Sequence, residues 1–290
     1  MKTPIVKAFA SALVLCLPAT KIFASPSFNF EDTTRKHLVA SAGKKTEKVV
    51  VLKEANVEFP AILTGNEEQS IDYIEKFSTT RKGYLVRTYN RSKKLFPQAA
   101  AILKKYDVPQ EFKVLLALES GFNPNATSSA GAVGYWQIMD AVAKEYGLKI
   151  ATGKKAEKKK TTKAEKKRRK ALMVDDRKNF VRSTHAAARY LKDRSRNLNN
   201  DWLLIAASYN CGVGNVWSAM EKTGKTNPTF WDIKNYLPAE TRAYVMNFIA
   251  LNVVFNNYEK FSNNTLCFKA LTCKAADRTD IDLANISTCL

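Results

Sequence analysis

The chain has 290 residues, a length that fits one or two domains. Its hydrophobic fraction of 45% is ordinary for a globular protein with a real core. With 47 Lys and Arg against 27 Asp and Glu, the formal net charge is +20, so negatively charged partners are expected. Nucleic acid, anionic lipid and anionic cell-wall polymer all qualify on charge alone.

The N-terminus has the layout of a secretory signal peptide. Lys2 and a second lysine precede an apolar run over residues 8–17, and small residues that resemble a cleavage site follow. We therefore expect a signal peptide over residues 1–24, because the run is too short to span a membrane. Cys16 is disfavoured as a lipid anchor, since Leu15 stands where a small residue is normally required. Export argues against DNA or RNA as the natural partner and favours the periplasm or cell envelope.

Four cysteines remain after the signal peptide: Cys211, Cys267, Cys273 and Cys289. An even number in an oxidising compartment permits disulfides. We expect Cys267 to pair with Cys273 or Cys289, and Cys211 to be a small buried thiol.

The rest of the chain divides into three parts by composition. Residues 25–65 form a polar lead-in expected to be extended or poorly ordered. Residues 66–260 carry helical periodicity, and residues 261–290 form a cysteine-bearing tail. Strand alternation is scarce, so the fold class is mainly α. Apolar helical patterns run through residues 67–103, 107–119, 175–190, 202–207 and 240–254.

A Lys-rich insert interrupts the helical part over residues 150–172. Within it, residues 154–170 hold eleven basic and two acidic side chains. Such a density of like charge is typical of a solvated surface segment. The insert is either a solubilising loop or an electrostatic tether to an anionic polymer.

One acid stands out at the end of an apolar helix. The signals at residues 107–111, a capping Asp107 and an early Pro109, predict a helix start, and Glu119 ends that helix before a turn-forming stretch. A negative charge at a helix C-terminus opposes the helix dipole, which makes an ordinary surface role less favourable. Partial burial there would raise the pKa of the Glu119 carboxyl and keep it protonated, as a general acid requires.

Two glycines follow the acid, within the string Gly-Ala-Val-Gly. Gly131 and Gly134 could let backbone and a sugar approach closely, with Gln137 and Met139 lining the floor. Equally, they could form only a tight turn with close packing. The residues alone leave both interpretations open.

Two further motifs lie downstream. Ser-Tyr-Asn-Cys-Gly-Val-Gly over residues 208–214 is expected to be a helix end and a glycine-rich loop, and without a preceding strand it does not predict a nucleotide site. Tyr209 could bond to the acid or to a sugar, or simply lie at a helix end. Glu240 falls in the first turn of the last helix, where the dipole alone would favour it.

Together these strings resemble the lytic transglycosylases of glycoside hydrolase family 23, most of all the membrane-bound lytic transglycosylase D group, over roughly residues 70–260. The resemblance implies a lysozyme-like fold of the goose-type lysozyme class. It also implies that Glu119 is the single catalytic acid and base, with no cofactor. The residues implied to line the sugar site are Ser128, Gln137, Met139, Tyr209 and Asn210, and those implied to support it are Glu240 and Tyr244.

Three departures from the family pattern are visible. They are the Lys-rich insert, Cys211 in place of the usual Ala, and a tail without LysM glycan-binding repeats. The implied reaction cleaves the MurNAc–GlcNAc β-1,4 bond of peptidoglycan and forms 1,6-anhydro-MurNAc, and we expect a monomer. A metal is disfavoured because His37 and His185 lie far apart without clustered acids.

Three other functions stay open. A goose-type lysozyme or chitinase-like hydrolase would need a second acid, such as Asp140 or Asp175, to hold a water. A non-catalytic cell-wall protein would bind glycan and leave it uncut. A basic polyanion-binding protein would depend on residues 154–170.

Overall fold

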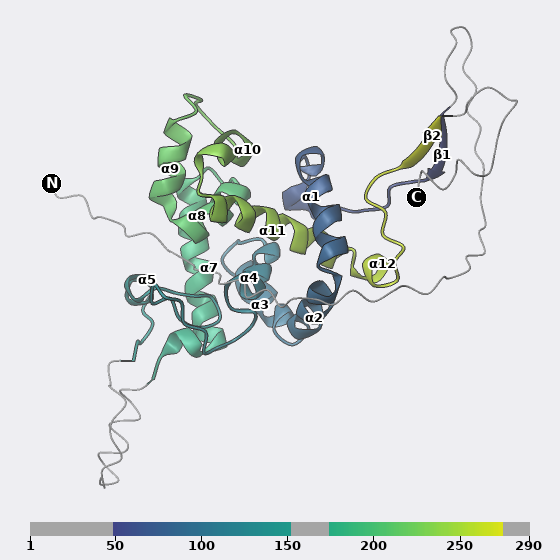
Figure 1. The fold of residues 1–290 in the computed structure, drawn as a ribbon. Coiled ribbons are helices and arrows are strands. Elements are labelled where there is room, and N and C mark those ends of the chain that lie inside the picture. The colour runs from purple at the N-terminus through teal and green to yellow at the C-terminus, as the bar shows by residue number, and fades with distance from the viewer. Residues whose placement is uncertain (1–48, 152–173, 275–290) are drawn as a thin grey trace, which may run out of the picture. The chain divides into compact units, whose positions relative to one another are not determined.

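The computed structural model of the chain describes residues 49–151 and 174–274 (Figure 1). The expected signal peptide over residues 1–24, the Lys-rich run over residues 154–170 and Cys289 lie outside the described residues. Close packing divides the described part into two units, one of residues 59–256 and one formed by the two flanking segments.

The larger unit is built of helices. In chain order they are α1 (Glu67–Thr80), α2 (Lys82–Ser92), α3 (Phe96–Lys104), α4 (Leu115–Ser120), α5 (Asp140–Glu145), α7 (Phe180–Asn197), α8 (Trp202–Cys211), α9 (Val213–Glu221), α10 (Phe230–Ile233) and α11 (Ala239–Asn256). Short 3-10 segments span Ala61–Leu63, Gln110–Val114, Asp176–Lys178 and Lys234–Tyr236. The mainly α fold expected from the sequence is confirmed.

Helix α8 forms the centre of this unit. Every residue of α8 after Trp202 is buried, because the helix is apolar on all sides. Asp201 caps it by accepting the backbone N–H groups of Leu203 and Leu204, both at 3.0 Å. Helices α7, α9 and α11 pack against α8, and α1 packs against α11 (Figure 1). The core therefore fixes α8 and α11 beside each other.

The helix that leads to Glu119 begins differently from the expectation. Asp107 is not its cap: this residue has a left-handed φ of 53°, and its carboxylate lies 3.3 Å from the Lys192 ammonium. Pro109 lacks the N–H that a capping side chain would accept, so a 3-10 segment starts after it. The α-helix proper begins only at Leu115.

The ends of the segment that contains the Lys-rich insert are joined to each other. The Lys149 N–H donates to Asp176 Oδ2 at 3.0 Å, and the Asp176 N–H donates to the Lys149 carbonyl at 2.8 Å. Asp176 is only 5% exposed and also accepts a bond from Arg182 at 2.8 Å. We call these reciprocal bonds the 149–176 clamp.

The smaller unit contains β1 (Val49–Lys53), α12 (Tyr258–Ser262) and β2 (Leu271–Lys274). The two strands pair antiparallel, with Val50 opposite Cys273. Asn56 joins the two segments of this unit. Its side chain donates to the Thr265 carbonyl at 2.9 Å and accepts the Cys267 N–H at 2.8 Å.

The cysteines differ in part from the expectation. Cys211 is a buried free thiol, as predicted, and burial raises its pKa. Cys267 is also a buried free thiol, so its expected disulfide with Cys273 or Cys289 is not formed. The Cys267 thiol instead donates to the Lys269 carbonyl at 3.0 Å.

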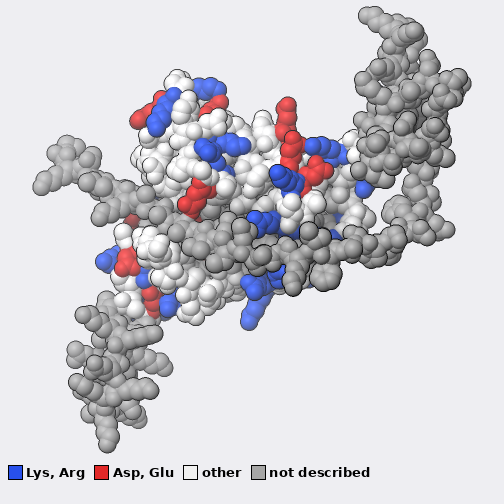
Figure 2. Space-filling model, in the orientation of Figure 1, with Lys and Arg blue, Asp and Glu red and all other residues white. Residues whose placement is uncertain are grey.

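The described surface mixes both signs of charge. Figure 2 shows acidic and basic side chains side by side on the visible face, with no field of one sign. Within the ranges that the structure describes, no helix is both long and apolar enough to cross a bilayer.

Candidate active site

Glu119 lies half-buried in the last turn of α4, which ends at Gly121 in a left-handed conformation with φ 56°. Tyr244, on α11, donates its hydroxyl to Glu119 Oε1 at 2.6 Å. Tyr244 is 8% exposed, so this hydrogen bond lies largely out of water. The fold thereby joins an acid and a phenol that are 125 residues apart.

Two tyrosines share the electrostatic environment of Glu119. Burial raises the pKa of Tyr244 well above its usual value, and the negative charge of Glu119 and the hydrogen bond to it raise it further. Burial likewise raises the pKa of Tyr209, with the Glu119 charge as the next cause. Both phenols therefore stay protonated at physiological pH and act as donors.

Tyr209 holds the loop that follows α4. Its hydroxyl donates to the Trp136 carbonyl at 2.7 Å, and the Trp136 indole donates to Thr184 at 2.9 Å. Trp136 is fully buried. Ser120, at the end of α4, also binds this loop: its hydroxyl donates to the Tyr135 carbonyl at 2.8 Å. The loop is thus fixed to α4, α7 and α8 around one buried indole.

The two glycines of this loop have different environments. Gly134 has φ 85°, and a Cβ placed there would lie 2.1 Å from the Arg177 carbonyl oxygen. Gly131 has φ 86°, but a Cβ there would meet nothing within 4 Å. The close backbone approach at Gly134 is therefore to another part of the chain.

Arg177 binds both acids that could have supplied a second carboxylate. It is 5% exposed, donates to Asp175 at 2.8 and 2.9 Å, and forms a short ion pair with Asp140. It also donates to the Ile138 carbonyl at 3.3 Å. Burial opposes ionisation of Asp175, but the hydrogen bonds and charge of Arg177 prevail and hold its pKa below the usual range. Both carboxylates are thus structural partners of one guanidinium.

Three of the residues expected to line a sugar lie on the same loop. The Gln137 amide nitrogen donates to the Gly134 and Ala126 carbonyls at 2.9 and 3.2 Å. Ser128 Oγ accepts the Ala132 N–H at 3.0 Å and so closes a turn. Met139 is half-buried and precedes α5.

The downstream motifs connect α8 to α11. Asn210 is buried and accepts the Thr241 hydroxyl at 2.8 Å. Glu240 is exposed, one turn before Tyr244 on α11. The expected glycine-rich loop is not present: only Gly212 separates α8 from α9, and Gly214 lies inside α9, where an N-terminal turn tolerates it.

The structure brings Glu119, Tyr209 and Tyr244 together, and it adds residues to which the sequence assigned no role: Ser120, Trp136, Arg177 and Thr241. Ser120 and Trp136 stand inside the acid's motif, so their position was a usable signal. Arg177 lies seven residues after a segment with eleven basic side chains, and no sequence motif distinguishes it from those side chains. Among the described residues, no three or more His, Cys, Asp or Glu form a group that could hold a metal ion.

Known proteins resemble this chain over the same region. Residues 97–231 match the family described as the Transglycosylase SLT domain. Membrane-bound lytic murein transglycosylase D of Escherichia coli is 32% identical over 183 residues, which are 62% of this chain and 35% of that protein. The chain thus spans about a third of the length of this relative.

Two solved structures are similar to part of this chain. Lytic transglycosylase Slt from Pseudomonas aeruginosa is 19% identical with a TM-score of 0.42, over 60% of this chain and 25% of that one. The 70 kDa soluble lytic transglycosylase from Escherichia coli is 16% identical with a TM-score of 0.41, over 74% of this chain and 39% of that one. The matched residues 97–231 contain Glu119, Tyr209 and the buried loop between them. The chain is therefore similar to the transglycosylase SLT domain over the segment that contains Glu119 and Tyr209.

Proposed function

We propose that this protein is an exported lytic transglycosylase, with a lysozyme-like helical domain that cleaves peptidoglycan glycan strands. Glu119 is the single general acid and base, and the bond cleaved is the MurNAc–GlcNAc β-1,4 linkage. The SLT domain and the lytic murein transglycosylase among its relatives support the substrate class. The observation that carries the choice of mechanism is the binding of both Asp140 and Asp175 to Arg177.

The proposed reaction begins with proton donation. Tyr244 donates to Glu119 Oε1, which favours the acid proton on Oε2. This proton passes to the oxygen between MurNAc and the next GlcNAc, the C1–O bond breaks, and the GlcNAc end leaves with a hydroxyl. An oxocarbenium-like centre develops at C1 of MurNAc.

The second half of the reaction uses the same residue. Glu119, now a carboxylate, accepts the proton of the MurNAc C6 hydroxyl, and O6 attacks C1 to close a 1,6-anhydro ring. No water is consumed, and Glu119 regains its proton. The nucleophile belongs to the same sugar, so its effective concentration is high and a second carboxylate is unnecessary.

In this proposal the remaining site residues shape the cleft. Ser128, Gln137, Met139, Tyr209 and Asn210 line the sugar site, and Glu240 and Tyr244 support it. The bonds of Gln137 and Ser128 within the loop support a role in holding that wall rigid. We also propose that residues 1–24 direct the protein to the periplasm or cell envelope and that it acts as a monomer.

The test is mass spectrometry of the products released from purified sacculi by the protein without residues 1–24. Anhydro-muropeptides, lighter by one water than hydrolysis products, are expected. Reducing-end products would replace this proposal with the hydrolase. Bound but uncut glycan would replace it with the non-catalytic binding protein.

Deleting residues 154–170 separates the enzyme from a polyanion-binding protein. We expect the deleted protein to cleave soluble glycan at the rate of the parent, because the 149–176 clamp closes the fold without the insert. Binding to intact sacculi, measured by sedimentation at low salt, is expected to weaken, since the deletion removes the most basic run of the chain. Loss of cleavage of soluble glycan would contradict this expectation.

Exchange of Tyr244 for Phe tests the hydrogen bond to Glu119. This bond strengthens as Glu119 becomes a carboxylate in the transition state, and a hydrogen bond to a charged group contributes about 1.5 kcal/mol or more. We therefore expect kcat to fall about tenfold with little change in KM. Tyr73→Phe is the matched control, because Tyr73 also donates to an α11 residue, Asn247, at 2.6 Å. Equal losses of kcat in the two variants would show an effect through helix packing rather than through the acid.

A further inference from the structure

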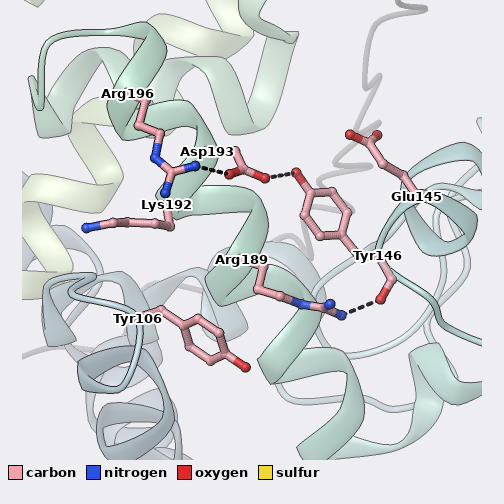
Figure 3. A pocket seen from close by; sticks show the side chains of 7 residues that line it. All are labelled: Tyr106, Glu145, Tyr146, Arg189, Lys192, Asp193 and Arg196. Carbon is pink, nitrogen blue, oxygen red and sulfur yellow. Dashed lines mark hydrogen bonds and ion pairs between the residues drawn. The ribbon is translucent and has the colours of Figure 1, made fainter.

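A concave site lies on α7, away from the residues that hold Glu119. It is a cavity of about 400 Å³ between the end of α3, the end of α5 and one face of α7 (Figure 3). We call it the α7 groove. Its lining residues are Tyr106, Glu145, Tyr146, Arg189, Lys192, Asp193 and Arg196.

The basic side chains of the groove follow one face of a helix. Arg189, Lys192 and Arg196 stand at positions i, i+3 and i+7 of α7, so their Cα atoms cover about 10 Å along the axis. Figure 3 shows the Arg189 side chain between the rings of Tyr106 and Tyr146, with Lys192 and Arg196 farther along the same helix. The groove thus offers three cations along one helical face, with a tyrosine ring on each side of Arg189.

The cations have weak partners that a ligand could replace. Lys192 lies 3.3 Å from Asp107, and Arg196 lies 3.4 Å from Asp193. Surface pairs of this kind contribute about 0–1 kcal/mol. Arg189 uses one of its five N–H groups on the Tyr146 carbonyl, and its guanidinium lies 5.6 Å from the centre of the Tyr146 ring.

The acidic side chains limit the total charge. Asp193 accepts the Tyr146 hydroxyl at 2.7 Å, and this bond holds the Tyr146 ring in place as one wall of the groove. Glu145 lies next to Tyr146 (Figure 3). The lining itself holds three cations against two carboxylates, a formal excess of one positive charge, and Asp107, which pairs with Lys192, lies outside the lining. Carboxylates, with one negative charge each, match these separate cations better than a polyphosphate, whose denser charge exceeds what the lining can balance. The rings would pack against the apolar parts of such a chain.

Nearby groups do not change this charge at neutral pH. Tyr106 bonds to His185 Nδ1 at 2.9 Å at the edge of the groove. Burial lowers the pKa of His185, and the positive charges of Lys105 and Arg189 lower it further, so the ring is neutral at pH 7. The cationic character of the groove rests on Arg189, Lys192 and Arg196.

We propose that the α7 groove binds an extended acidic peptide through its carboxylates. This site is separate from the acid: Tyr190 stands between, its ring 6.0 Å from that of Tyr146 and 5.6 Å from that of Tyr209. The proposal goes beyond the proposed function, and its test uses no glycan, so its failure would leave that function untouched.

The test is NMR titration of the full chain with a triglutamate peptide. We expect saturable amide shifts at Tyr106, Tyr146 and along the 189–196 face of α7. The charge reversal Lys192→Glu with Arg196→Glu is expected to weaken this binding at least tenfold. These side chains are 33% and 72% exposed, so the fold should tolerate the change.

A matched control carries the same change of charge elsewhere. Lys76→Glu with Lys94→Glu alters two exposed lysines outside the groove and should leave the titration unchanged. Equal weakening in both variants, or shifts that miss the groove, would overturn the proposal. Inorganic phosphate is the second probe: if it saturates the same amides as tightly as triglutamate, the site binds anions of any kind and the peptide proposal fails.

Discussion

Exchange of Glu119 for Gln is expected to reduce glycan cleavage by about 100- to 10,000-fold, the usual contribution of a general acid and base. Gln keeps the size of the side chain and an oxygen that can accept the Tyr244 hydroxyl, so the contact at 2.6 Å can persist. What it removes is the proton that the leaving group needs. The measurement is the rate of release of soluble muropeptides from purified sacculi.

The fold should survive this exchange. We expect the midpoint of thermal unfolding to stay within about 2 °C of the parent's. The exchange should change the free energy of unfolding by less than about 1 kcal/mol, which shifts the midpoint by no more than this in a unit of this size. Glu111→Gln is the control, because it makes the same chemical change eight residues earlier and should leave the rate unaltered. If the Glu119 variant retains more than a tenth of the parent rate, another group supplies the proton.

The largest effect on stability is expected at Gly134. An Ala there must adopt φ 85°, and its Cβ would lie 2.1 Å from the Arg177 carbonyl oxygen. Backbone strain and overpacking each cost about 1–3 kcal/mol, so we expect a loss of about 3 kcal/mol or more. Chemical denaturation followed by circular dichroism measures it.

Gly131→Ala is the comparison that isolates the clash. Gly131 has nearly the same φ, 86°, but open space at the position of a Cβ. The Gly131→Ala variant should lose only about 1 kcal/mol of stability, the cost of holding Ala in the left-handed conformation. Equal losses at the two positions would show that φ alone sets the need for glycine and that the contact with Arg177 adds nothing.

The sequence predicted the parts that local patterns determine. The bounds of α8 and α11 and the start of α1 were expected within a few residues, because apolar periodicity and a clear start mark each of them, whereas the end of α1 was not predicted. The Glu119 carboxylate was selected as the candidate acid because it opposes the helix dipole at the end of an apolar run. Each of these signals lies within a few turns of chain.

Contacts between distant segments could not be read in the same way. The hydrogen bond of Tyr244 to Glu119 spans 125 residues, and without a resemblance no local feature of α11 marks Tyr244. The cap expected at Asp107 failed because Pro109 removed its donor, a conflict visible only when both positions are considered together. The role of Arg177 depends on which carboxylates the fold brings to it, not on its neighbours in sequence.

The 149–176 clamp makes the chain between Lys149 and Asp176 a suitable place to insert a further sequence. Because Lys149 and Asp176 hold these two positions together, we expect a change in the number of residues between them to cost little, about 0.6 kcal/mol for each doubling of a flexible connection. A fluorescent protein or an affinity tag inserted there should leave the helices around Glu119 intact. The same tolerance would let natural relatives gain or lose whole segments at this point while keeping one helical core.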